Sequence, residues 1–69
     1  MTNSTLTNVY KNIKKYRIEK KLSQFKLAEI TDLSEDYISL IETGKRVPSL
    51  KTLCKIADAL EIEVYKFFL

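Results

Sequence analysis

The chain lacks histidine and has very little cysteine, two residue types on which catalytic and metal sites often depend. Among its 69 residues there is no histidine and no tryptophan, with one cysteine, one glycine and one proline. Without histidine, the commonest general base and the commonest metal ligand are absent. Cys54, as the single cysteine, cannot form a disulfide within the chain. These absences predict a protein that is not an enzyme and holds no metal or cofactor.

Long apolar runs are also absent. No stretch approaches the roughly 20 apolar residues that span a bilayer, and none has the apolar core of a secretion signal. The sequence therefore predicts a cytoplasmic protein with no membrane partner. A chain of this length buries only about 60% of the surface that it exposes when unfolded. Its thin core leaves no evident site for a small-molecule ligand and makes oligomerisation a candidate source of stability.

Charge is present but unevenly distributed. The net charge is +3, and residues 1–22 carry six basic side chains and one acidic side chain. Residues 23–44 carry one basic and five acidic side chains, and residues 45–69 carry five basic and three acidic ones. Basic outer segments suggest contact with phosphates. Ordinary solvated helix faces explain the same pattern equally well, so charge alone does not decide.

Apolar residues recur every three or four positions, which predicts helices throughout, and no strand-like alternation is evident. The helices are expected at about 7–21, 24–31, 35–43, 50–60 and 64–69, after a flexible arm at residues 1–6. The single domain 1–69 is therefore predicted to be all-α, a compact five-helix bundle.

Serine and glycine mark the expected helix ends. Ser23, Ser34 and Ser49 each precede a helix, where a hydroxyl caps the free amides of the first turn. Gly44 and Asp32 follow a helix, where a left-handed residue ends it. The apolar residues expected to point inward are Val9, Ile13, Tyr16, Leu27, Ala28, Ile38, Ile41, Leu50, Leu53, Ala57 and Leu60. Cys54 is expected to be a small, buried or half-buried apolar residue.

The two helices at 24–31 and 35–43, joined by a tight turn, have the dimensions of a helix-turn-helix spanning about 23–43. This region and the residues that follow it carry an ordered set of motif residues: Ser23, Gln24, Leu27, Ala28, Leu33, Ser34, Tyr37, Ile38, Ser39, Ile41, Glu42, Gly44, Lys45, Arg46, Pro48, Ser49 and Leu50. With this set the chain resembles the Cro/repressor-type (xenobiotic-response-element) helix-turn-helix family, which includes phage repressors and restriction–modification controller proteins.

The resemblance implies a lambda-repressor-like domain whose third helix enters the DNA major groove. The positions that it implies for base reading are Glu35, Asp36, Tyr37, Ser39 and Leu40. The positions that it implies for phosphate contact are Gln24, Thr43, Lys45 and Arg46. Arg17 and Glu42 match positions that form an ion pair in relatives. Arg17 is also expected to contact a phosphate, as a second role.

Three departures from the family pattern stand out. Asp32 replaces the glycine usual between the two helices, and Phe25 occupies a position that is commonly polar. Glu35 and Asp36 open the recognition helix with negative charge. These carboxylates either stabilise the first turn through the helix dipole, or one of them accepts a hydrogen bond from cytosine N4.

The last five residues are rich in apolar side chains. One of Phe67 and Phe68 is expected to close the bundle, but a short helix cannot direct all of these side chains into one small core. The surplus predicts a homodimer interface. Its residues are expected to be Tyr65, Phe67, Phe68 and Leu69.

Taken together, the sequence and the resemblance predict a sequence-specific, double-stranded-DNA-binding transcriptional regulator, a repressor or controller that acts as a dimer on a palindromic operator. The alternative, from another class, is a protein-interaction module such as an antitoxin or anti-regulator with weak or no DNA binding.

Overall fold

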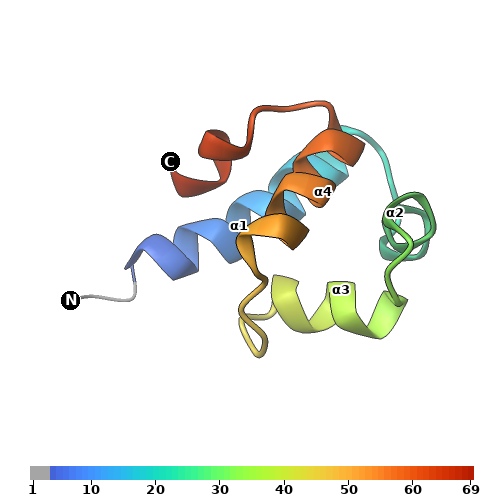
Figure 1. Cartoon of the computed structure of the whole chain (residues 1–69), viewed down its shortest axis with the longest axis horizontal. Helices are drawn as coiled ribbons and strands as arrows, with labels where there is room; N and C mark the ends of the chain where they lie inside the picture. Colours follow the sequence, from blue (N-terminus) through green and yellow to red (C-terminus); the bar gives the residue numbers. More distant parts are fainter. Residues whose placement is uncertain (1–3) are drawn as a thin grey trace.

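A computed structural model describes residues 4–69 of the chain. It contains four α-helices and one short 3-10 helix, in the order α1 (Ser4–Glu19), α2 (Gln24–Thr31), α3 (Glu35–Glu42), α4 (Leu50–Leu60) and η1 (Val64–Phe68). Figure 1 shows α4 in the middle of the molecule, α1 and η1 to one side, α2 to the other and α3 along one edge. The all-α prediction is confirmed for the described residues, and the count of five α-helices is wrong. The last element, at five residues, is a 3-10 helix instead.

The first helix begins earlier than the sequence predicts. Residues 1–6 were expected to form an arm, but α1 begins at Ser4 and includes Thr5 and Leu6. No proline or glycine interrupts this segment, so extending the helix adds one hydrogen bond for each residue fixed. The rest of the predicted arm, residues 1–3, lies outside the described residues.

Serine caps begin three of the helices, as predicted. The Ser23 hydroxyl accepts a hydrogen bond from the Lys26 amide at 2.9 Å. The equivalent bonds run from the Tyr37 amide to Ser34 at 3.0 Å and from the Thr52 amide to Ser49 at 3.1 Å. Each cap satisfies an amide that the helix itself leaves without a partner.

Left-handed residues end the helices, although only one of them is glycine. Gly44 has a φ of 80° and Asp32 a φ of 58°, both as predicted, and Lys21 and Glu61 adopt the same conformation at 60°. The amide of the residue after each one donates to a carbonyl five positions back. The residues that follow the three non-glycine stops, Leu22, Leu33 and Ile62, are apolar and pack against the core. This packing holds non-glycine residues in a conformation that they otherwise disfavour.

The core contains side chains from every described helix. Its buried members are Val9, Ile13, Leu27, Ala28, Ile38, Ile41, Leu53, Ile56, Ala57, Leu60 and Phe67. Two predictions for α4 are wrong, because Leu50 is 65% exposed and Cys54 is exposed. Leu50 lies in the first turn of α4, and Cys54 lies about 100° around the helix from Leu53, away from the buried stripe.

The chain end is attached to α1 by one aromatic residue and one amide. Phe67 is fully buried, and the centroid of its ring lies 6.3 Å from that of Tyr16. The Asn12 side-chain amide donates to the Phe67 carbonyl at 2.9 Å, which satisfies a backbone acceptor beyond the last full helix. These contacts fix η1 against α1 on the side of the molecule away from α3 (Figure 1).

Candidate nucleic-acid interface

The helix-turn-helix is formed by α2 and α3, with Asp32, Leu33 and Ser34 as the turn. Helix α3 buries Ile38, Ile41 and Glu42 on its inner side. Its other side faces away from the bundle, and α3 lies along the edge of the molecule (Figure 1). A helix placed in this way has an outer face that a large ligand can approach.

The structure places all five residues predicted to read bases on α3. Glu35 and Asp36 are exposed in the first turn, and Tyr37, Ser39 and Leu40 are half-buried. Both carboxylates lie at the positive end of the helix dipole, where negative charge is favourable. This placement fits the purely stabilising interpretation of the two carboxylates, and it also leaves them accessible to a base edge.

The loop after α3 carries the predicted phosphate contacts Thr43, Lys45 and Arg46, all of them exposed. The Thr43 hydroxyl donates to the Ser39 carbonyl at 2.9 Å. The guanidinium carbon of Arg46 lies 5.4 Å from the centre of the Tyr37 ring, within range of a cation–π interaction. The first contact closes the end of α3, and the second brings the loop back against the half-buried Tyr37 of the same helix.

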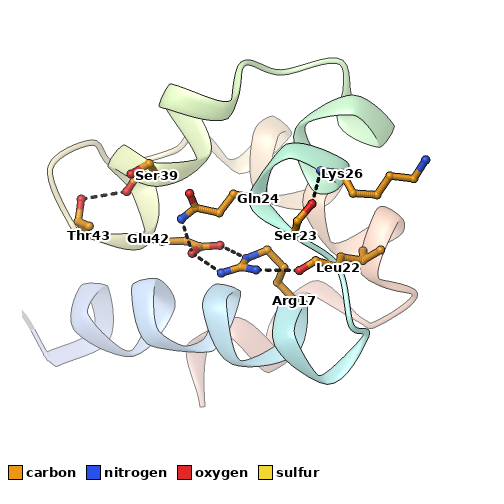
Figure 2. Close-up of polar contacts among 8 residues, drawn as sticks. All are labelled: Arg17, Leu22, Ser23, Gln24, Lys26, Ser39, Glu42 and Thr43. Atoms are coloured by element: carbon orange, nitrogen blue, oxygen red, sulfur yellow. Dashed lines mark hydrogen bonds and ion pairs between the residues drawn. The ribbon is translucent and has the colours of Figure 1, made fainter.

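Arg17 and Glu42 form a buried, two-pronged ion pair between α1 and α3 (Figure 2). Arg17 Nε donates to Glu42 Oε2 at 2.7 Å, and Nη2 donates to Oε1 at 3.1 Å. Arg17 Nη1 also donates to the Leu22 carbonyl at 2.7 Å. The exposed fractions of the Arg17 and Glu42 side chains are 10% and 2%. Arg17 thus joins α1 to α3, and its second role at a phosphate stays a prediction.

Gln24, the predicted phosphate contact at the start of α2, belongs to the same polar network (Figure 2). Its Nε2 donates to Glu42 Oε1 at 3.1 Å, and the residue is half-buried. Because a side-chain amide has two N–H donors, one remains for another acceptor. Glu42 therefore connects α1, α2 and α3 and orients Gln24 at the end of the candidate interface.

Tyr10 and Lys14 were not singled out from the sequence as site residues. The Tyr10 ring lies directly against Gly44, where an added Cβ would be 2.6 Å from Tyr10 Cε2. Glycine is required here both for its φ of 80° and for this close approach. The spacing of Tyr10, Lys14 and Arg17 along α1 is the one signal that could have indicated a shared face.

The residues predicted to form a dimer interface divide into two groups. Tyr65, Phe68 and Leu69 are 57%, 42% and 73% exposed, whereas Phe67 is fully buried. The prediction that Phe67 forms part of the dimer interface is therefore wrong, because its ring lies in the core of its own chain. Beside η1 lies an open hollow of about 230 Å³, lined by Cys54, Ala57, Asp58, Ile62, Glu63 and Val64.

Residues 4–69 contain no group of three or more potential metal-ligating side chains. Nor is any helix in this part of the chain both long and apolar enough to cross a membrane.

Comparison with known proteins gives consistent results. A helix-turn-helix family model matches residues 13–67. The immunity repressor protein of Bacillus phage phi105 is 46% identical over 56 residues, which are 81% of this chain and 39% of that protein. Control protein C.SmaI of Serratia marcescens is 42% identical over 55 residues, which are 80% of this chain and 66% of that protein. The chain thus spans well under half of the phage repressor.

Solved structures show the same likeness over nearly the whole fold. The restriction-modification controller protein C.AhdI from Aeromonas hydrophila is 34% identical and superposes with a TM-score of 0.88, covering 94% of this chain and 98% of that one. The controller protein C.Esp1396I is 39% identical with a TM-score of 0.84, covering 93% and 82% of the two chains. The chain therefore belongs to the helix-turn-helix family, with phage repressor and restriction–modification controller proteins among its homologues.

Proposed function

We propose that the chain is a sequence-specific, double-stranded-DNA-binding transcription regulator that acts as a homodimer on a palindromic operator. The observation that carries the proposal is the outward face of α3, flanked by exposed Lys45 and Arg46. An α-helix with its side chains is about 10–12 Å across, close to the roughly 12 Å width of the major groove. The repressor and controller relatives support the same conclusion.

Base reading is assigned to the outer residues of α3. Glu35 accepts a hydrogen bond from cytosine N4, and the hydroxyl of Ser39 pairs with a base edge. Leu40 and the accessible part of Tyr37, which also packs against the core, present apolar surface to a thymine methyl group. Asp36 lies in the same first turn, where it stabilises the helix or accepts a second base contact.

Phosphate contacts hold α3 in register on the duplex. Gln24 lies near the C-terminal end of α3, where it bonds Glu42, and its free N–H and the amides of the first turn of α2 donate to a phosphate. Thr43, Lys45 and Arg46, in the loop that follows α3, contact the backbone beyond the recognition helix. The Glu42 network keeps Gln24 at a fixed position relative to α3.

A salt titration separates this function from its alternative. If Lys45 and Arg46 of both protomers neutralise phosphates, the log–log slope of affinity against salt is at least as steep as about −3.6, at 0.9 per contact. The titration uses fluorescence anisotropy with a mixed-sequence duplex. A protein with no measurable affinity at low salt, or with a flat slope, would refute the DNA-binding proposal.

The alternative function has one observation in its favour. Glu35 and Asp36 are exposed at the start of α3, where they would repel a phosphate backbone. A module that binds a basic protein surface, such as an antitoxin or anti-regulator, would use these charges directly. That interpretation is favoured if the titration finds no duplex binding.

The dimer is assigned to the C-terminal surface that Tyr65, Phe68 and Leu69 leave exposed. Phe68→Ser is expected to shift the protein from dimer to monomer, because it removes apolar area that association would bury. Sedimentation velocity at micromolar concentration measures the shift. Phe25→Ser is the matched control, since Phe25 is a 60% exposed aromatic residue on α2. A wild-type chain that stays monomeric both free and on DNA would contradict the assignment.

A further inference from the structure

One face of α1 lies against the C-terminal end of α3 and the loop that follows. Two contacts define this face, that of the Tyr10 ring with Gly44 and that of the Arg17 guanidinium with Glu42. Helical spacing places Lys14 between them, four residues after Tyr10 and three before Arg17. Figure 2 shows the Arg17 side chain rising from α1 toward the end of α3 at this place.

Lys14 is exposed, and it forms no ion pair with any residue between 4 and 69. Glu42, the carboxylate at the end of α3 that α1 contacts, is buried and already paired with Arg17. Glu35 and Asp36 lie at the other end of α3, about 10 Å from Glu42 along the helix axis at 1.5 Å per residue. The positive charge of Lys14 is therefore free to act on a ligand.

The loop beside Lys14 adds charge of the same sign. Lys45 and Arg46 are exposed and follow Gly44, whose missing side chain allows the loop to approach α1 closely. The three cations come from two separate segments of the chain, and the fold places them at one end of α3. An array of cations beside a groove-binding helix fits a row of backbone phosphates.

We infer that Lys14 contacts a DNA phosphate next to those bound by the loop, so that the interface extends from the helix-turn-helix onto α1. The inference rests on the proposed function and adds a residue to it. The contact carries no sequence information, because phosphates are the same at every base pair. Lys14 thus contributes affinity and register, whereas α3 contributes specificity.

The chain offers a matched control at the next position. Lys15 lies about 100° further around α1. Its ammonium is 5.3 Å from the centre of the Tyr16 ring, and that ring packs against Phe67. Lys15 therefore lies toward η1, whereas Lys14 lies toward α3. Replacing either lysine by glutamine removes the same charge from the same helix.

The experiment measures the salt dependence of duplex binding for wild type, Lys14→Gln and Lys15→Gln. On a mixed-sequence duplex, Lys14→Gln is expected to weaken binding several-fold at low salt and to reduce the magnitude of the log–log slope by about 0.9 per protomer. Lys15→Gln is expected to keep the wild-type slope. The slope does not depend on the fraction of active protein, so a partial loss of folded material would not imitate the effect.

Equal slopes for the two variants would overturn the inference and leave the proposed function intact, provided that the wild type binds with a steep slope. A wild type that does not bind the duplex would instead overturn the proposed function and the inference that rests on it. A slope change on Lys15→Gln alone would place the phosphate contact on the η1 side of α1, which contradicts the assignment to Lys14.

Discussion

Glu42→Ala is expected to lower the free energy of unfolding by about 3–5 kcal/mol, the usual cost of removing one partner from a buried ion pair. The variant leaves the Arg17 guanidinium buried without its carboxylate, and it also removes the acceptor of the Gln24 amide. A domain of this length is stable by only about 3–10 kcal/mol. The loss is measured by urea unfolding followed by circular dichroism.

Glu29→Ala is the matched control for Glu42→Ala. Glu29 also pairs with a cation, Lys26, at 2.9 Å, but both of these side chains are 56% exposed. An exposed pair of this kind is worth about 0.5 kcal/mol or less. If the two alanine variants unfold at the same urea concentration, the structural role assigned to Glu42 is wrong.

Phe67→Ala is expected to cost about 3–5 kcal/mol, the range found when a large aromatic residue is removed from a core. The Phe67 ring is fully buried beside Tyr16, and its carbonyl holds the Asn12 amide. Without the ring, η1 loses its main attachment to α1. The variant is expected to be largely unfolded in urea concentrations that leave the wild type folded.

Phe68→Ala tests the assignment of Phe67 to the core and of Phe68 to the surface. Phe68 is 42% exposed, so its removal is expected to change the unfolding of the monomer far less than Phe67→Ala does. Unfolding measured at low protein concentration keeps the effect of dimerisation out of the comparison. If Phe68→Ala destabilises as strongly as Phe67→Ala, the assignment of Phe67 to the core and Phe68 to the surface fails.

Features with a local cause could be predicted from the sequence. The serine caps, the turn around Asp32 and the stop at Gly44 each depend on a few neighbouring residues, and the structure has them where the sequence places them. The apolar stripe of α3 is equally local, because Ile38 and Ile41 lie three residues apart.

Features that depend on tertiary packing could not be predicted from the sequence. Lys21 and Glu61 adopt left-handed conformations because Leu22 and Ile62 pack against the core, and nothing in their own residue types indicates this. Leu50 and Cys54 fit a helical pattern but lie outside the stripe of α4 that the other helices cover. Which of Phe67 and Phe68 is buried likewise depends on where η1 packs against α1.

The candidate site was predicted through resemblance more than through periodicity. Periodicity indicates that α3 has an outer face, but it does not indicate that Gln24 shares Glu42 with Arg17, or that Arg46 lies over the Tyr37 ring. These contacts join residues that are 9 to 25 positions apart in the chain. They connect the proposed phosphate contacts physically to α3, the helix proposed to read bases.

Selection of bound sequences from a random duplex pool shows whether α3 reads DNA. We expect a palindromic consensus whose half-sites lie roughly 34–36 Å apart, one turn of the double helix, because each protomer of the proposed two-fold dimer would place its α3 in the major groove. A pool that shows no enriched sequence after repeated rounds would contradict the claim that α3 reads DNA.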